Sequence, residues 1–300
     1  MELRHVLGNT WVAEANTALL PVYKITEKDI VLIDTGYAKL DRSGLTAMIE
    51  DNGFHLRGVI CSHAHFDHSG NVRYLQQRCG ARAAAHIIEA GISVNPDAYR
   101  ANYVALTYGK SREYFLEECF TADAIIGPED EYLDFCGVRF GILPLPGHSA
   151  GHIGVVTPDN VAYVGDCLLD QQQIDSAKLP TSMFIARDLQ SKAFLRQTDY
   201  PAYIIAHKAV VTDKTELDAL VDSNSEFIHR KADELLEDLA DGMTFSQWIA
   251  AFCQRESIRT KNEFKFSIIE RNFANFVDWL TDEGRVTVQR EYCAKTYYHG

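Results

Sequence analysis

The sequence has 300 residues, of which 46% are hydrophobic and 24% charged, a composition typical of a globular protein with a sizeable core. Its 42 acidic and 29 basic residues give a net charge of −13, which argues against binding of nucleic acid or anionic lipid through the overall charge of the chain. No apolar run approaches the ~20 residues that span a bilayer, and the first residues lack the layout of a secretory signal. We therefore expect a cytoplasmic protein that does not bind membranes.

The N-terminal part of the chain reads as strands and one helix. Residues 17–24 and 30–33 are apolar runs separated by a polar turn, which predicts a β-hairpin. Residues 41–52 have the pattern of a helix, and 59–61 form a short apolar strand that leads directly into a group of histidines. Polar groups at the end of a buried strand are typical of an active site.

The middle of the chain is predicted to hold a helical insert followed by more strands. Residues 87–120 have a helical pattern and are rich in aromatic side chains, namely Tyr99, Tyr103, Tyr108, Tyr114 and Phe115. Strand-like runs follow at 137–143, 153–156, 161–164 and 203–206.

After residue 212 the pattern becomes helical, so we place a boundary between 1–212 and 213–300. Asp213-x-x-Glu216 and Thr244-x-x-Gln247 have the spacing of helix-starting capping boxes, and a third helix is expected over 262–283. Residues 285–290 alternate like a strand. This order predicts a helical, winged-helix-like C-terminal module. The seven cysteines include no C-x-x-C pair, which favours reduced, buried thiols over a disulfide framework.

The strongest chemical signal is the segment Ser-His-Ala-His-Phe-Asp-His-Ser-Gly, which places His63, His65, Asp67 and His68 within six positions. Imidazole and carboxylate groups are ligands that divalent zinc prefers. A loop that leaves a strand can direct alternate side chains at two neighbouring ions. His63 and His65 can thus face one metal, and Asp67 and His68 the other.

Three further ligand-type residues follow predicted strands: His148 in Pro-Gly-His-Ser, Asp166 in Val-Gly-Asp-Cys, and His207 in Ile-Ala-His-Lys. Seven candidate ligands suit two metal ions that each keep a coordination position open for water. The carboxylate of Asp166 can bridge the two ions.

The order H-x-H-x-D-H, then His, Asp and His, resembles the metallo-β-lactamase superfamily of hydrolases, in particular its binuclear-metal, glyoxalase II-like or β-lactamase-like branch. The resemblance covers roughly residues 5–212. It implies an αββα sandwich of two mixed sheets flanked by helices, with the metals at one edge. It implies His63, His65 and His148 on the first metal, Asp67, His68 and His207 on the second, and Asp166 between them. Asp34-Thr-Gly36 resembles the family's strand-ending turn, which supports the active-site loop without binding metal.

The chain departs from the family pattern at Ala206-His207-Lys208, where Gly-His-Gly is usual. The change keeps the ligand type but crowds the turn and brings a cation near the site. Cys167 follows Asp166 and is interpreted as a buried neighbour thiol, and His152 as structural. We leave His5, His55, His86, His229 and His299 without a role.

Two divalent cations, zinc first with manganese or iron as alternatives, can hold a bridging hydroxide that attacks a carbonyl carbon or a phosphorus. Asp67 can act in catalysis by orienting that hydroxide or moving its proton. A small-molecule ester, thioester or lactone is the first choice of substrate. The aromatic insert, with Lys110 and Arg112, either closes over the substrate or is an ordinary amphipathic helix.

Three other functions remain open. A nucleic-acid phosphodiesterase or ribonuclease would use the basic residues Arg255, Arg259, Lys261 and Lys265 of the C-terminal module to grip a strand. A diiron redox enzyme of this fold usually has glutamate at position 65 and a flavin module, and a metal-sensing binder would lack ligands. The C-terminal module is expected instead to pack on the sandwich with those charges on a solvated face, to shape the site's mouth or to form a homodimer contact.

Overall fold

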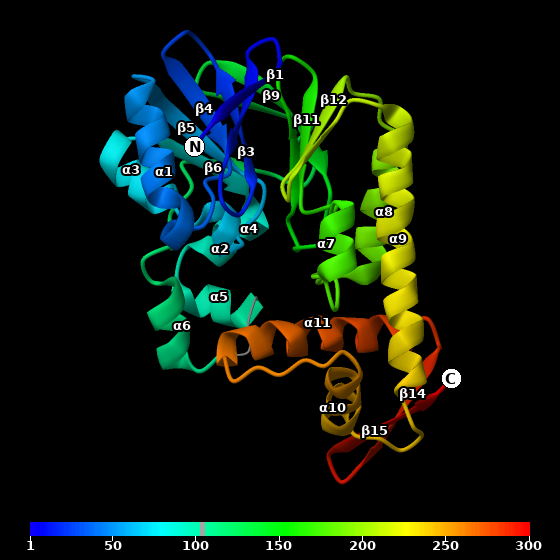
Figure 1. Cartoon of the computed structure of the whole chain (residues 1–300). Coiled ribbons are helices and arrows are strands. Elements are labelled where there is room, and N and C mark those ends of the chain that lie inside the picture. Colours follow the sequence, from blue (N-terminus) through cyan, green and yellow to red (C-terminus); the bar gives the residue numbers. More distant parts are fainter. Residues whose placement is uncertain (103–105) are drawn as a thin grey trace.

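The computed structural model describes residues 1–102 and 106–300, so Tyr103 of the predicted insert lies outside the described residues. Two mixed β-sheets pack face to face in this part of the chain, with helices on both outer sides (Figure 1). The αββα sandwich is confirmed.

The first sheet holds seven of the described strands in chain order, antiparallel from β1 to β4 and parallel from β4 to β7. Its strands are β1 (Leu3–Leu7), β2 (Thr10–Glu14), β3 (Leu19–Lys24), β4 (Asp29–Ile33), β5 (His55–Cys61), β6 (Arg82–His86) and β7 (Ala124–Ile126).

The second sheet has the order β13-β12-β11-β10-β9-β8 and is antiparallel except for the pair β11 and β12. Its strands are β8 (Tyr132–Phe135), β9 (Val138–Pro144), β10 (Ile153–Val156), β11 (Val161–Gly165), β12 (Ala202–Ile205) and β13 (Ala209–Val211). A backbone bond from Leu19 N to Ala206 O, 2.8 Å long, joins the two sheets beside the end of β12.

The main apolar core lies between the sheets and joins side chains such as Val31 of β4 to Val155 of β10 and Tyr163 of β11. A second core, with Leu195 and Leu217, packs helices on the outer face of the second sheet. The helices of the first 212 residues are α1 (Ala38–Asp51), α2 (Phe66–Ser69), α3 (Val72–Cys79), α4 (Ile87–Ser93), α5 (Pro96–Asn102), α6 (Tyr108–Phe115), α7 (Gln171–Ser176) and α8 (Ile185–Arg196).

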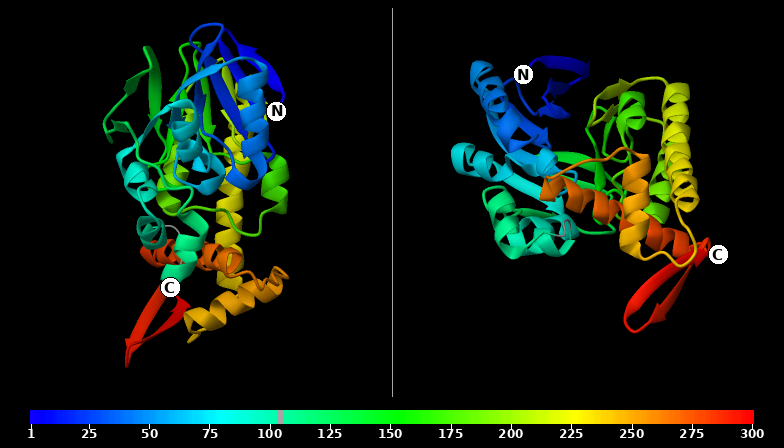
Figure 2. Two further views of the ribbon diagram at one scale, coloured as in Figure 1. Left: turned by 90° about the vertical axis from the view of Figure 1, so that its left-hand side faces the viewer. Right: turned by 60° about the horizontal axis from the view of Figure 1, so that its bottom comes forward.

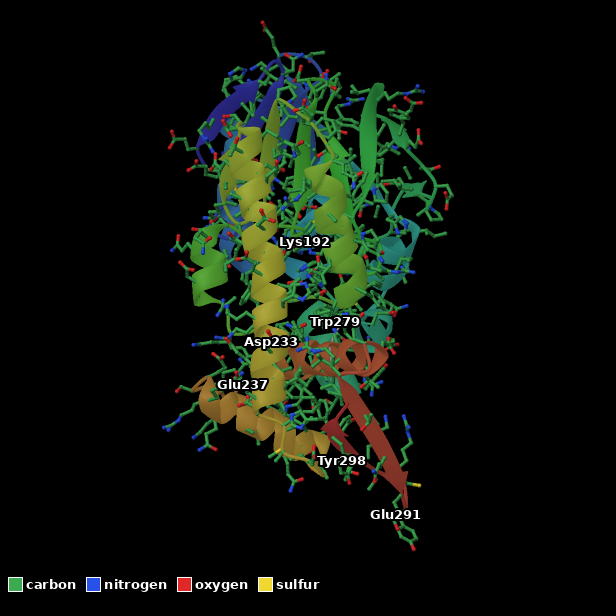
Figure 3. All side chains as sticks on the ribbon, turned by 90° about the vertical axis from the view of Figure 1, so that its right-hand side faces the viewer. Lys192, Asp233, Glu237, Trp279, Glu291 and Tyr298 are labelled. Carbon is green, nitrogen blue, oxygen red and sulfur yellow. The ribbon has the colours of Figure 1, made fainter. Side chains whose placement is uncertain are left out.

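The last part of the chain consists of α9 (Lys214–Glu237), α10 (Phe245–Arg255), α11 (Glu263–Asp282), β14 (Val286–Glu291) and β15 (Ala294–His299). Figure 2 shows β14 and β15 projecting from the body as a hairpin, and Figure 3 labels Glu291 near its tip. Trp248, Phe252, Phe273 and Phe276 form a separate core that also receives Ile185 of α8. The module therefore packs directly on the sandwich.

The helix starts follow the sequence signals. Asp213 accepts bonds from the backbone N–H groups of Thr215 and Glu216, and Thr244 and Gln247 form a reciprocal capping box. The predicted strand at 285–290 is β14. Cys61, Cys119 and Cys167 are buried, but Cys79 and Cys293 are exposed, so the expectation of buried thiols is wrong for those two.

Among the described helices, none combines the length and the hydropathy that crossing a membrane requires.

Candidate metal centre

All seven predicted ligands follow strands at one edge of the sandwich. His63, His65, Asp67 and His68 come directly after β5, and the other three, His148, Asp166 and His207, follow β9, β11 and β12. The first sheet supplies one loop and the second sheet supplies three. Because both sheets end at this edge, residues up to 144 positions apart in the sequence meet there.

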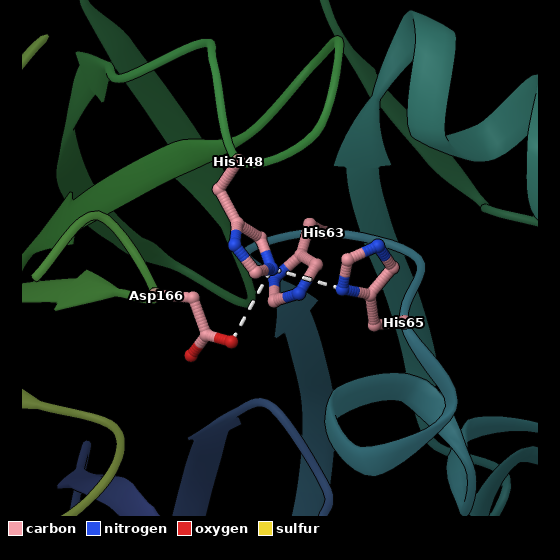
Figure 4. A group of neighbouring side chains, drawn as sticks. All are labelled: His63, His65, His148 and Asp166. Carbon is pink, nitrogen blue, oxygen red and sulfur yellow. Dashed lines mark hydrogen bonds and ion pairs between the residues drawn. The ribbon is translucent and has the colours of Figure 1, made fainter. Parts of the chain in front are cut away.

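The ligand atoms form two groups in which every atom lies within 4.8 Å of the others. The first group, cluster one, consists of His63, His65 and His148 together with Asp166, all buried (Figure 4). The second, cluster two, consists of Asp67, His68 and His207. The structure thus brings together the residues that the sequence assigned to each of the two metals.

Asp166 lies between the clusters and directs one oxygen at each. Its Oδ2 is 3.3 Å from Nε2 of His148 in cluster one. Its Oδ1 is 3.2 Å from Nε2 of His68 and 3.3 Å from Nε2 of His207 in cluster two. Asp67, at the same edge, has Oδ2 3.9 Å from Nε2 of His207.

Hydrogen bonds on the far side of the rings determine which nitrogen faces the site. Nδ1 of His148 lies 2.9 Å from the Thr181 carbonyl, and Nδ1 of His207 lies 2.8 Å from the Thr17 carbonyl. A carbonyl oxygen only accepts, so both Nδ1 atoms carry a proton, and either ring in its neutral form would present an Nε2 lone pair to Asp166. Lone pairs beside a carboxylate repel it unless a cation lies between them or the ring gains a second proton.

Asp34 fixes His68 in the same manner. Its carboxylate accepts bonds from Nδ1 of His68 at 2.8 Å, from the Tyr163 hydroxyl at 2.7 Å, and from the N–H and hydroxyl of Ser62 at 2.7 and 2.6 Å. Although Asp34 lies near His63 and His68, four donors already occupy its oxygens. Asp34 is therefore a support of the loop and not a free ligand.

The donor set fits a divalent cation. Nε2 of His63 is buried without a hydrogen-bond partner among the described residues, while its Nδ1 lies 3.0 Å from the Ser62 hydroxyl, which itself donates to Asp34. Burial, followed by the neighbouring histidines, holds the pKa of His63 well below its ordinary value. Burial also lowers the pKa of His65. Both rings are neutral near pH 7, the state in which imidazole binds metal.

In cluster two the neighbouring charges raise the pKa of a histidine instead of leaving it low. Burial would lower the pKa of His207, but Asp166 outweighs it and raises that pKa to about 9. Burial would raise the pKa of Asp166, but His68, His207 and His148 together hold it well below its ordinary value. The protein thus keeps an ionised carboxylate beside positive charge, the arrangement that a pair of metal cations would complete.

Two buried side chains that the sequence did not single out as ligands hold the loops. Glu89, just after β6, accepts bonds from Ala64 N at 2.8 Å, Ser149 Oγ at 2.8 Å and Gly151 N at 2.7 Å. It therefore links the loop of His63 and His65 to that of His148. His152 Nε2 accepts from Asp166 N at 3.1 Å, which gives this histidine a structural contact. Glu89 lies in α4, just after β6, and no sequence signal pointed to it because that strand was not predicted.

A cavity of about 260 Å³ opens over both clusters and over Asp166. Asp188 and Lys192 of α8, a buried ion pair 2.5 Å apart, also line it. Much of the wall is apolar and comes from α2, α9, α11 and the segments on either side of α7: Phe66, Leu169, Ala177, Leu179, Pro180, Phe227, Ile228 and Ile268. Three of these side chains belong to residues 213–300.

Four residues considered from the sequence stay away from this chemistry. Lys208 donates to the Ala15 carbonyl at 2.7 Å, so its cation is directed away from the ligands. Lys110 forms an exposed ion pair with Glu113, and Arg112 lies by Tyr108; neither lines the cavity among the described residues. Burial raises the pKa of the Cys167 thiol to about 12, so the thiol stays protonated.

The aromatic insert instead supports the cavity's rim. Tyr99 stacks on Phe115 with ring centroids 4.7 Å apart, and Tyr114 stacks on Phe264 of α11 at 5.0 Å. Phe264 also contacts Phe66, the residue before Asp67.

Comparison with known proteins agrees with this architecture. Hydroxyacylglutathione hydrolase GloC of Haemophilus influenzae is 30% identical over 145 residues, which are 47% of this chain and 62% of that protein. Hydroxyacylglutathione hydrolase of Ectopseudomonas mendocina is 28% identical over 43% of this chain and 39% of its own length. The chain thus spans less than two thirds of either relative.

Two solved structures share the fold over nearly the whole chain. A metallo-β-lactamase family protein from Thermus thermophilus superposes with a TM-score of 0.72 at 18% identity, covering 94% of both chains. A β-lactamase domain protein from Burkholderia ambifaria also gives 0.72, at 14% identity, covering 100% of this chain and 94% of its own. The sequence model of the metallo-β-lactamase superfamily matches residues 21–209, more than half of the chain. The chain therefore belongs to the metallo-β-lactamase superfamily.

Proposed function

We propose that this protein hydrolyses a small-molecule thioester, ester or lactone with two divalent cations, one at each cluster. The observation that carries the proposal is Asp166, whose two oxygens face Nε2 atoms of different clusters at 3.2 to 3.3 Å. A carboxylate in this position can bind two ions at once. Zinc is the first choice of metal because histidines dominate the ligand set, with manganese or iron as alternatives.

Two cations held there would polarise the carbonyl oxygen of an acyl substrate and lower the pKa of an attacking water towards ~7. Asp67, which lines the cavity beside both the metal ligands and open space, would orient that water and accept its proton. The water oxygen forms the new bond to the acyl carbon, the bond to sulfur or oxygen breaks, and the proton passes to the leaving group.

The shape and chemistry of the cavity support a small acyl substrate. A volume of about 260 Å³ holds a small organic group, and the apolar wall from α9, α11 and the segments on either side of α7 suits hydrocarbon atoms rather than a sugar-phosphate backbone. The sequence relatives are named for the hydrolysis of a hydroxyacylglutathione, which favours thioesters within this class.

The basic residues of the C-terminal module give nucleic-acid cleavage little support. Arg255 donates to the Glu234 carbonyl at 2.5 Å and lies 3.2 Å from Asp238 and 3.9 Å from Glu237, so its charge is engaged within the protein. The expectation that Arg255 lies on a solvated face is therefore wrong. We propose that nucleic acid is not the substrate.

A side-by-side assay tests the function. Zinc-loaded protein is incubated with acyl thioesters, lactones, carboxylic esters, phosphodiesters and β-lactams, with chelator-treated protein as the blank. We expect hydrolysis of at least one of the first three classes, lost on chelation and in Asp67→Asn. The exposed variant Lys110→Ala, outside the cavity, should retain full activity. Turnover confined to phosphodiesters would overturn the proposal.

A further inference from the structure

Helix α11 of the C-terminal module reaches the metal centre through the segment between α7 and α8. Figure 1 shows α11 crossing the molecule beneath α7. The carbonyl of Thr181, in that segment, accepts the Nδ1 proton of His148 at 2.9 Å. The orientation of this ligand-type ring therefore depends on where residues 177–184 lie.

The same segment is tied to the residue before His148. The backbone N–H groups of Met183 and Phe184 donate to the Gly147 carbonyl at 2.8 and 3.0 Å. A side chain at Gly147 would collide with the backbone of Asp188, because a Cβ there would lie 2.3 Å from the Asp188 Cα. The backbone at Gly147 is therefore packed so closely that it cannot move independently of residues 177–184.

Two asparagines of α11 hold the segment from its other side. Asn272 Nδ2 donates to Thr181 Oγ1 at 3.2 Å, and Asn275 Nδ2 donates to the Ser182 carbonyl at 2.8 Å. Asn272 is 6% exposed. A buried amide that loses its hydrogen-bond partner is destabilising, so Asn272 favours one position of the segment, and the bond from the half-buried Asn275 favours the same position.

The helix that carries these amides is itself rigidly placed. Phe273 and Phe276 of α11 are fully buried against Trp248 and Phe252 in the C-terminal core. The amides are therefore presented by a fixed surface, and the bonds run without interruption from α11 to residues 181–182 and from Thr181 to His148.

We infer that Asn272 and Asn275 are positioning residues of the metal centre: through Thr181 they orient His148, so the C-terminal module tunes the metal affinity of cluster one. The inference rests on the proposed metal centre but not on the identity of the substrate. Ring orientation set by such outer contacts typically changes metal affinity by about 10- to 100-fold.

The test compares metal binding in Asn272→Ala/Asn275→Ala with that of the wild-type full-length protein. Zinc affinity is measured by competition with a chromophoric chelator, and the Co²⁺-substituted protein is followed by its visible absorption. We expect about tenfold weaker binding at one of the two sites, an altered Co²⁺ spectrum, and an unchanged affinity at the other site. Each single variant should show a smaller loss in the same direction, which keeps the test decisive when the double variant folds poorly.

Trp248→Phe is the matched control. The indole of Trp248 is buried in the same module and donates its N–H to the Leu235 carbonyl of α9 at 2.7 Å, away from residues 177–184. This variant should lose thermal stability and retain wild-type zinc affinity and Co²⁺ spectrum. An equal loss of zinc affinity in Trp248→Phe, or no loss in the asparagine variants, would overturn this inference but not the proposed function. A wild-type protein that binds no metal would overturn the proposed function as well.

Discussion

Asp166 differs from the other ligand-type residues because its two oxygens face different clusters. Removing any one histidine would leave each cluster with ligands of its own. Removing this carboxylate would take an oxygen away from beside each cluster and delete the negative charge that holds the pKa of His207 at about 9. Asp166 is thus the residue that couples the two clusters.

We expect Asp166→Ala to lower the metal content of both sites, to less than about half of the wild-type value after dialysis, because a shared ligand is lost. Elemental analysis of gently purified protein measures this directly. The neighbouring Cys167→Ala variant is the control, because this buried thiol is not in either ligand group and should leave metal content unchanged. Two tightly bound metals in Asp166→Ala would show that the bridging assignment is wrong.

Glu118 is a buried carboxyl outside the ligand set. Burial, with a smaller contribution from nearby Asp67, raises its pKa to about 7 against the opposing charges of Lys39 and Arg42. The folded protein therefore binds a proton that the unfolded chain releases near pH 4.5. The stability that this bound proton contributes to the folded protein is fully present below about pH 4.5 and is lost as the pH rises through about 7.

Glu118→Gln should consequently stabilise the metal-free protein by about 1–3 kcal/mol at pH 8 and have almost no effect at about pH 4. Urea unfolding followed by tryptophan fluorescence at the two pH values measures the difference. A stabilisation that does not depend on pH would mean that the carboxyl is not protonated in the folded state.

At the site, the sequence identified the side chains that follow strands and the supporting Asp34 and His152, but not the other groups that hold the ligand-type residues. His63, His148, Asp166 and His207 follow apolar runs, a pattern that is readable one segment at a time. The acceptor for His148 is a backbone carbonyl, which has no sequence signature. Asn272 lies 91 positions from its partner Thr181, so only the tertiary fold pairs them.

At the scale of elements, prediction succeeded where burial and periodicity agree. β10 has the expected bounds, and β3 and β4 form the expected hairpin. β6, with the sequence Arg-Ala-Ala-Ala-His, was missed because alanine favours helices, whereas here three alanines lie fully enclosed between neighbouring strands. β1 was missed because it is an edge strand with exposed polar side chains.

Two consecutive isoleucines of α11 have different surroundings: one lines the cavity and the next does not. Ile268 is part of the cavity wall, whereas Ile269 packs against the C-terminal core. We expect Ile268→Ala to enlarge the cavity and shift preference towards longer acyl chains, with a several-fold change in kcat/KM between short and long substrates.

Ile269→Ala provides a control of identical chemistry on the same helix. It should cost stability, about 1–3 kcal/mol for a partly buried isoleucine, without changing the chain-length profile. Steady-state kinetics over an acyl series separates the two variants. Identical profiles for both would show that α11 does not contact the substrate.

Over the whole molecule, charge is unevenly distributed. Residues 244–300 carry eight basic and seven acidic residues, while the rest of the chain carries 21 and 35, so this last segment is near neutral on a strongly acidic protein. Of its basic residues, Arg255 is already paired with acidic neighbours, and Arg259, Lys261 and Lys265 are exposed. The free positive charge that could attract a polyanion is therefore small.

Reversing the charge at Arg259, Lys261 and Lys265 together should leave turnover of a small acyl substrate within about twofold of wild type, because these side chains lie on an exposed face outside the cavity. We also expect no measurable affinity of the wild-type protein for RNA or DNA at physiological salt. If the three residues did contact phosphates on a duplex, each reversal would reduce the slope of log affinity against log salt by about 0.9. Fluorescence anisotropy with labelled oligonucleotides across a salt series measures that slope. Tight, salt-sensitive binding that the triple variant abolishes would make nucleic acid the better substrate class, because only a polyanion would depend on charges so far outside the acyl cavity.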